Sequence, residues 1–220
     1  MKQHKYYNII LVDDHILLRD ALATLIGSFD ECKVIDVAAN GRELINSLEK
    51  GKLPDLVLLD LNMPEMDGYE TAHWLQKNHP EIRIIILTMF DSEIALIRLL
   101  QAGVRGFLKK DVHPVELKTA LIAVAEDGYY YSNQTTGKLA SLLQKNYNNH
   151  ASLERSMLTA KEIEFLKMAS TDMTYKEIAQ KMKITPRAID GYRDALFEKL
   201  DVKSRVGLAI YAVKNGIVTF

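Results

Sequence analysis

The sequence predicts a doubly wound α/β domain built on a five-stranded parallel sheet, followed by a small all-helical domain. Five short apolar runs alternate with helical patterns over about the first 127 residues, which is typical of strands buried on both faces. From Met157 onward every periodic segment has helical spacing. The charge changes at the same point, because residues 157–220 contain 11 basic and 8 acidic residues, whereas the preceding part is acidic.

The strands of the first domain are predicted from short apolar runs that end at turn residues. They are expected at Ile9–Val12, Val34–Ala38, Leu56–Leu59, Ile84–Thr88 and Gly106–Lys109. The helices between them are expected near residues 15–28, 40–50, 66–78, 91–101 and 114–126, with Gly51 and Gly103 as stop signals. A parallel sheet of this kind binds ligands at the carboxyl ends of its strands.

The second domain is expected to contain four helices, near residues 159–170, 174–182, 186–200 and 204–214. Before it, a short amphipathic helix is expected over Gln134–Gln144, and the polar stretch Asn146–Ser152 predicts a flexible link. We therefore divide the chain into a first domain at 1–128, a linker at 129–156 and a second domain at 157–220.

The composition excludes several classes of protein. With 48% apolar and 26% charged residues, the 220-residue chain is neither disordered nor collagenous. The single cysteine, Cys32, cannot form a disulfide framework and fits a reducing compartment. No apolar run approaches the ~20 residues of a spanning helix, and Met1–Asn8 lacks the apolar core of a signal peptide. We expect a cytoplasmic protein that does not bind membranes.

Polar residues follow the predicted strands at one edge of the sheet. Asp13 and Asp14 end the first strand, Asp60 the third and Thr88 the fourth, and Lys110 follows the fifth. Converging carboxylates repel one another unless a cation lies among them, and oxygen ligands at an open site favour Mg²⁺. A lysine and a hydroxyl provide a positive charge and a donor for a phosphoryl group. The set predicts a carboxylate that accepts phosphate, although each residue alone has a structural explanation.

At these residues the chain resembles bacterial two-component response regulators. The matching motifs are Leu11–His15, Leu58–Gly68 and Gly106–Asp111, and the resemblance extends from Ile9 to about Gly128. It implies a flavodoxin-like receiver domain that takes phosphate from a cognate histidine kinase or a small phosphodonor. It also implies no enzymatic activity beyond self-phosphorylation and autodephosphorylation.

The resemblance assigns roles to individual residues. Asp60 is implied as the phosphoacceptor and as one of the Mg²⁺ ligands. The other implied ligands are Asp14 directly, Asp13 through water, and the main-chain carbonyl of Asn62. Thr88 is implied to turn its hydroxyl onto the phosphoryl group, and Phe107 to follow it inward as the switch aromatic. Of two adjacent lysines, the pattern selects Lys110 rather than Lys109. His15 could touch the site, but an exposed position at a helix start is favoured.

The second domain contains a helix-turn-helix pattern. Thr174–Ala179 begins one helix, Lys183–Thr185 turns the chain, and Pro186–Leu196 begins the next. Two short helices at this spacing fit a motif whose second helix enters the major groove. The stretch Leu158–Ile217 resembles the LuxR-type helix-turn-helix of NarL/FixJ-family regulators, which implies binding to double-stranded promoter DNA as a homodimer. Val206, Ile210 and Val213 form an apolar stripe suited to a dimer contact.

The recognition helix departs from the family pattern, because Asp190, Gly191 and Asp194 stand where groove-facing donors such as lysine are common. Arg187 and Arg193 are the expected base or phosphate contacts. Lys181, Lys183, Lys203 and Arg205 are expected to contact the DNA backbone. Asp190 could repel phosphate, or it could accept from a cytosine amino group or orient Arg187; the second alternative is favoured.

These observations favour a phosphorylation-controlled, DNA-binding transcription regulator. Two alternatives have the same fold: a regulator that works without phosphorylation, and a protein-binding helical module. An enzyme of the haloacid-dehalogenase type is disfavoured, because that chemistry needs a second aspartate two residues after the nucleophile. Asn62 occupies this position, and its amide cannot exchange the proton.

Overall fold

The computed structural model describes residues 6–89, 93–133, 135–137, 158–215 and 217–218. The chain divides into two compact units, one with residues 1–91 and 96–138 and the other with residues 92–95 and 139–220. Each unit is described by itself. None of the helices in the described ranges combines the length and the apolar character needed to cross a bilayer.

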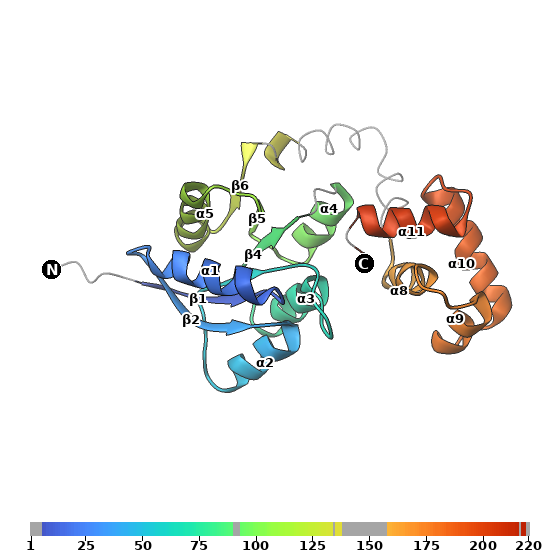
Figure 1. The fold of residues 1–220 in the computed structure, drawn as a ribbon, viewed down its shortest axis with the longest axis horizontal. Helices are drawn as coiled ribbons and strands as arrows, with labels where there is room; N and C mark the ends of the chain where they lie inside the picture. Colours follow the sequence, from blue (N-terminus) through green and yellow to red (C-terminus); the bar gives the residue numbers. More distant parts are fainter. Residues whose placement is uncertain (1–5, 90–92, 134, 138–157, 216, 219–220) are drawn as a thin grey trace. The chain divides into compact units, whose positions relative to one another are not determined.

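The first unit is a parallel sheet with helices on both faces (Figure 1). Its strands are β1 (Tyr7–Val12), β2 (Cys32–Ala38), β3 (Leu56–Leu59), β4 (Arg83–Thr88), β5 (Gly106–Lys109) and β6 (Tyr130–Tyr131), in the order β2-β1-β3-β4-β5-β6. Its helices are α1 (Ile16–Gly27), α2 (Gly41–Glu49), α3 (Gly68–Asn78), α4 (Glu93–Gln101) and α5 (Pro114–Glu126). The doubly wound α/β class and the five predicted strands are confirmed: β3 and β5 have the predicted bounds, and β1, β2 and β4 begin one or two residues earlier than predicted.

The expected number of strands is wrong by one. The sheet has a sixth strand, β6, whose residues Tyr130 and Tyr131 pair in parallel with Gly106 and Phe107 of β5. The Tyr130 hydroxyl donates to a Glu116 carboxylate oxygen at 3.1 Å, and the Tyr131 hydroxyl donates to the Val104 carbonyl at 3.1 Å. A two-residue strand is too short to have a periodic pattern, so the sequence did not predict it. The two side-chain hydrogen bonds hold it against the sheet.

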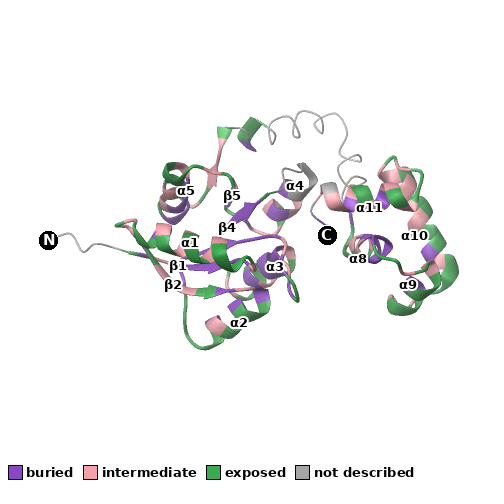
Figure 2. Ribbon diagram, in the orientation of Figure 1, coloured by how far each residue is buried: buried purple, intermediate pink, exposed green. Residues whose placement is uncertain are grey.

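The buried residues form a layer on each side of the central strands (Figure 2). All four residues of β3 are fully buried, as expected for a central strand of a two-faced sheet. Helices α1 and α5 pack on one face against Ile9, Leu58 and Ile85, whereas α2 and α3 lie on the opposite face. The amphipathic helix predicted over Gln134–Gln144 lies largely outside the described residues, although 135–137 are helical.

The second unit contains the four predicted helices. They are α8 (Ala160–Ala169), α9 (Tyr175–Lys181), α10 (Pro186–Lys199) and α11 (Arg205–Lys214). Thr159 and Thr174 each form a reciprocal capping box with the glutamate three residues on, which satisfies free backbone N–H groups at the helix start. The helices enclose a separate core around Phe165, Leu196 and Leu208, each fully buried.

The turn between α9 and α10 fixes the start of the second helix. Lys183 adopts the left-handed backbone conformation with φ 56°. Its N–H donates to the Gln180 carbonyl at 3.1 Å, and the N–H of Ile184 donates to the Ala179 carbonyl at 3.0 Å. This is a Schellman ending, for which glycine is the usual residue at the left-handed position. The Thr185 hydroxyl then accepts from the Ala188 N–H and starts α10.

Candidate functional site

The structure brings four of the predicted polar residues together at the carboxyl edge of the sheet. Asp13, Asp60 and Thr88 end or directly follow β1, β3 and β4, and their exposed fractions are 1%, 3% and 0%. Parallel register places these three strand ends side by side, since Val12 pairs with Leu59, and Leu59 with Ile86. Lys110 follows β5, and its N–H donates to the Thr88 carbonyl at 2.9 Å.

Lys110 bridges the two buried aspartates. Its Nζ lies 2.8 Å from Asp13 Oδ2 and 2.9 Å from Asp60 Oδ2, and its side chain is 6% exposed. Lys109 instead is one of the residues that line a cavity beside β5, and successive side chains of a strand alternate between faces. The structure thus brings Lys110, and not Lys109, to the acidic cluster, in agreement with the sequence pattern.

Burial and charge act in opposite directions in this cluster. Burial raises the pKa of the Asp60 carboxyl above its usual value, although the hydrogen bond and charge of Lys110 oppose the rise. Burial disfavours the Lys110 ammonium, but hydrogen bonds to Asp13 and Asp60 outweigh it, and the pKa of Lys110 lies above its usual value. The ammonium is therefore the resident counter-charge of two carboxylates that would otherwise repel each other.

Asp14 and His15 form the more exposed side of the cluster. The His15 Nδ1 lies 3.1 Å from Asp13 Oδ1 and 3.0 Å from Asp14 Oδ1. The His15 side chain is 66% exposed and stands at the N-cap of α1, as the favoured prediction states. The ring nevertheless contacts two of the carboxylates, so the alternative that His15 touches the site also describes the structure.

The donor set suits a small divalent cation. One ligand atom from each of Asp13, Asp14, His15 and Asp60 lies within 4.8 Å of the others. The Asp60 Oδ2 atom faces the Lys110 ammonium at 2.9 Å and the Asp14 Oδ1 atom faces His15 Nδ1 at 3.0 Å, and a carboxylate oxygen with one such contact has a further lone pair for a cation. Carboxylate oxygens at a partly open site fit Mg²⁺. Asn62 lies in the loop after β3 and is half-buried, and its carbonyl contact to a metal stays a prediction.

A glycine that the sequence did not single out shapes the loop after Asp60. A Cβ on Gly68 would lie 2.3 Å from the Asp60 carbonyl oxygen and 2.7 Å from the Leu61 Cα. Only glycine permits this approach, which lets the Gly68 N–H donate to the Leu61 carbonyl at 2.9 Å. The neighbouring Asp67 caps α3 through a capping box with Glu70, which explains it without a metal.

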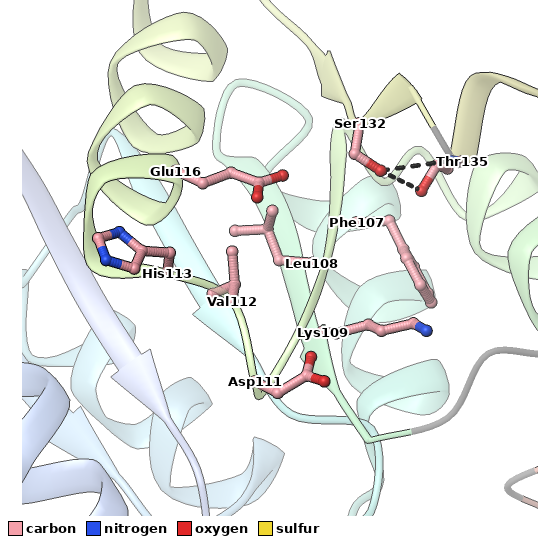
Figure 3. A pocket seen from close by; sticks show the side chains of 9 residues that line it. All are labelled: Phe107, Leu108, Lys109, Asp111, Val112, His113, Glu116, Ser132 and Thr135. Carbon is pink, nitrogen blue, oxygen red and sulfur yellow. Dashed lines mark hydrogen bonds between the residues drawn. The ribbon is translucent and has the colours of Figure 1, made fainter.

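Phe107, the predicted switch aromatic, is 5% exposed and borders a cavity of about 250 Å³ (Figure 3). The cavity lies between β5, the start of α5 and the segment after β6, and it is lined by Phe107, Leu108, Lys109, Asp111, Val112, His113, Glu116, Ser132 and Thr135. Its lining includes none of the clustered aspartates. The cavity is therefore adjacent to the switch residue and distinct from the acidic cluster.

In the second unit, the structure changes the interpretation of the recognition helix. Arg187, Asp190, Gly191 and Asp194 are all exposed along α10. Arg193 is held on this helix by both acids: its Nη1 donates to Asp190 Oδ1 at 3.0 Å and its Nε donates to Asp194 Oδ1 at 2.9 Å. The suggestion that Asp190 orients Arg187 is wrong in this respect, since its partner is Arg193.

Arg205 also differs from the prediction of a DNA-backbone contact. Its Nε donates to the Ala169 carbonyl at 2.9 Å and its Nη2 donates to the carbonyls of Thr171 and Met173. The guanidinium lies 5.2 Å from the centre of the Tyr175 ring. Arg205 thus joins α11 to the loop between α8 and α9. Lys181, Lys183 and Lys203 are exposed, as backbone contacts need to be.

Comparisons with known proteins agree with both halves of the chain. Residues 9–122 match the family model of the response regulator receiver domain, and residues 156–212 match that of the luxR family of bacterial regulatory proteins. The chain is 33% identical to the nitrate/nitrite response regulator protein NarL of Escherichia coli K12, over 99% of this chain and 100% of NarL. It is 31% identical to the response regulator GacA of Pseudomonas viridiflava, over 96% and 97% of the two chains.

A solved structure extends the likeness to the fold. The two-component response regulator RcsB in a complex with DNA superimposes with a TM-score of 0.67 and 25% identity, over 94% of this chain and 98% of that chain. In that complex the similar protein is bound to DNA. The acidic cluster lies within the range matched by the receiver model, and the helix-turn-helix lies within the range matched by the luxR-family model.

Proposed function

Because the chain belongs to the NarL/FixJ family of two-component response regulators, we propose that Asp60 accepts a phosphoryl group from a histidine kinase and thereby controls DNA binding. The observation that carries this proposal is the Asp13–Lys110–Asp60 bridge at 2.8 and 2.9 Å, beside the buried Thr88. This arrangement gives the Asp60 carboxylate a positive neighbour, and Thr88 ends the adjacent strand at the same edge of the sheet.

Each step of the transfer can be assigned to a residue of the acidic cluster or of the loop after β3. An Asp60 carboxylate oxygen attacks the phosphorus of a phosphohistidine, the P–N bond breaks, and the electron pair returns to the imidazole nitrogen. Lys110 moves from the Asp60 carboxylate to a phosphoryl oxygen and offsets the added charge. Asp13, Asp14 and Asn62 would hold Mg²⁺, which supplies Lewis-acid stabilisation of the phosphoryl oxygens when bound.

The switch follows from the position of Thr88. A phosphoryl group on Asp60 gives the Thr88 hydroxyl a strong acceptor, and Thr88 precedes the segment that leads into α4. Phe107 lies one strand away, where Ile86 and Phe107 are paired. Because Phe107 borders a cavity of about 250 Å³, its surroundings have room to rearrange. Movement there changes the face formed by α4, β5 and α5.

The output is binding to promoter DNA by a homodimer in the cytoplasm. Arg187, Lys183 and Lys203 are exposed candidates for base and phosphate contacts. On α11, Val206 and Ile210 are 67% and 50% exposed, an apolar pair suited to contact with a second copy. The domain limits at 1–128, 129–156 and 157–220 stay predictions, and the linker then includes β6.

The test is phosphorylation by acetyl phosphate in the presence of Mg²⁺, followed by intact-protein mass spectrometry. The wild-type chain is expected to gain one phosphoryl group, and Asp60→Ala none. Asp111→Asn is the matched control, since this aspartate is exposed and lies beside Lys110 in the sequence without joining the cluster. Phosphorylation of Asp60→Ala to the wild-type level would overturn the assignment.

A second measurement separates the alternative of a regulator that does not need phosphorylation. Affinity for DNA is measured with the phosphorylated wild type and with Asp60→Ala, over the same randomised duplexes. The proposal requires the phosphorylated form to bind more tightly. If the wild type is phosphorylated normally and the two proteins bind DNA with equal affinity, the phosphorylation-independent regulator is favoured.

A further inference from the structure

We propose that α10 recognises cytosine amino groups in the major groove through Asp190 and Asp194, and that Gly191 exists to let DNA approach the helix backbone. The inference rests on the proposed function, because it names the feature of DNA that this helix selects. It starts from three observations on one stripe of α10: an unexplained glycine, two exposed acids, and an arginine shared between them.

The fold does not require glycine at position 191. It lies in the interior of the 14-residue helix α10, where glycine is less stable than alanine. Its backbone is not in the left-handed region, and a Cβ built on it meets no atom within 4 Å. The fold therefore tolerates a larger residue, and the absence of a side chain is explained by a surface that approaches α10 closely.

The two acids are compatible with DNA because Arg193 shares its charge with both. Asp190 and Asp194 are 57% and 65% exposed, whereas Arg193 is 29% exposed. The formal charges of these three groups and of the exposed Arg187 add to zero, so the stripe does not carry net repulsion towards phosphates. A carboxylate accepts about four hydrogen bonds, so the contacts of Arg193, one to Asp190 and two to Asp194, leave each acid able to accept more.

The chemistry of the major groove selects the base. Cytosine presents an amino donor there with no acceptor on the same base, whereas adenine places the N7 acceptor beside its amino group and guanine and thymine offer acceptors. An exposed carboxylate is therefore attracted by cytosine and repelled by part of every other base edge. The guanine of the same or the next pair is a suitable partner for Arg187, through O6 and N7.

The first part of the test is a selection from randomised 30-base-pair duplexes, using the full chain phosphorylated by acetyl phosphate. We expect C·G pairs at one or two fixed positions within each half-site. Replacement of such a pair by T·A is expected to weaken wild-type binding by about tenfold or more, because one good base contact discriminates at this level. Asp190→Ala is expected to bind both duplexes equally, which is loss of discrimination and not of all binding.

The second part compares two glycine-to-alanine variants. Gly191→Ala is expected to raise the thermal midpoint of unfolding while it weakens binding to the selected duplex about tenfold. Gly27→Ala is the matched control: this residue ends α1, is exposed, and its Cβ would also meet no atom within 4 Å. It is expected to leave DNA affinity unchanged. A purely structural role for Gly191 would instead change stability and leave affinity alone.

The outcomes separate the two levels of the proposal. If the wild type selects a sequence without fixed C·G pairs, or if Gly191→Ala binds as tightly as the wild type, the inference is wrong and the proposed function stands. If the chain, phosphorylated or not, selects no sequence and binds the duplexes only weakly, the proposed DNA-binding function fails as well. Fixed C·G pairs, lost discrimination in Asp190→Ala and weakened Gly191→Ala binding together support the inference.

Discussion

The acidic cluster and the exposed stripe of α10 are built in opposite ways. The cluster gathers Asp13, Asp60 and Lys110 from three separate strands, and the side chains of all three are at most 6% exposed. The stripe takes its groups from a single helix, and its acids are more than half exposed. The geometry of the acidic cluster therefore depends on the fold of the whole sheet, whereas the geometry of the stripe depends on the individual side chains of one helix.

This difference predicts how substitutions behave. A change in the buried cluster leaves a charge without its partner in a low-dielectric environment, so stability and function change together. A change on the exposed stripe leaves the core intact, so binding changes alone.

The strongest test is removal of the buried lysine. Lys110→Ala leaves Asp13 and Asp60 side by side without a counter-charge, and should lower the free energy of unfolding by about 3–5 kcal/mol. Urea unfolding followed by Trp74 fluorescence reports on this unit, which contains the only tryptophan. Mg²⁺ should restore part of the loss. Lys109→Ala is the control, and an equal loss in both variants would contradict the assignment.

The second test asks whether Arg205 is structural. Arg205→Ala removes charge-assisted hydrogen bonds to three backbone carbonyls and should lower the stability of the second unit by about 2–3 kcal/mol. Lys203 is exposed and lies two residues earlier, so Lys203→Ala should leave stability unchanged. It should reduce the slope of log affinity for DNA against log salt concentration by about 1. Hydrogen exchange of the α11 amides and salt titrations of affinity measure the two effects.

A third test uses the pH dependence of the second unit. Glu162 is partly desolvated, which raises its pKa, but the Thr159 backbone N–H and the Lys199 ammonium at 2.9 Å outweigh this and hold the pKa below its usual value. A carboxylate with a lowered pKa stabilises the fold above the usual value near 4.5 and loses that contribution as the pH falls through the folded-state pKa.

In Glu162→Gln the capping hydrogen bonds can persist, but the charge is gone. Hydrogen exchange of the amides in 160–169, followed from pH 7 to pH 3, should show a flatter acid-side loss of protection than in the wild type. Glu164→Gln, an exposed change on the same helix, serves as the control. Parallel acid-side curves for the wild type and Glu162→Gln would show that the ion pair with Lys199 contributes little.

The smallest expected effect is a gain. Lys183 has a left-handed backbone at φ 56°, a conformation that is strained for a residue with a Cβ. Lys183→Gly should therefore stabilise the second unit by at most about 1 kcal/mol. If Lys183 also contacts a DNA phosphate, the same variant should bind all duplexes more weakly. Thermal unfolding and binding then change in opposite directions, and a fall in stability would show that the lysine side chain has a structural role.

The sequence predicted the elements that follow from repeating patterns and missed those that follow from individual contacts. The five predicted strands are short apolar runs that end at turn residues, and the resemblance to response regulators selected Lys110 rather than Lys109. The strand β6 escaped notice because two tyrosines carry no period, and hydrogen bonds to Glu116 and Val104 hold them.

The helix-turn-helix shows the same limit at the level of side chains. Its four helices were predictable from caps and spacing, including Thr185 before Pro186. The partners of the arginines were not, because the carbonyls that Arg205 binds lie more than 30 residues away in the chain. Similarly, spacing alone could not decide whether Asp190 pairs with Arg187 or with Arg193, both three residues from it.

The Lys110 bridge also bears on how a newly made chain matures. Many small metal-binding domains fold only once their ion has bound, because the free energy of metal binding drives their folding. Here an ammonium from the chain itself occupies the place between Asp13 and Asp60. The buried carboxylates of the receiver unit therefore have a counter-charge before any divalent ion binds, so folding of this unit does not have to wait for the ion.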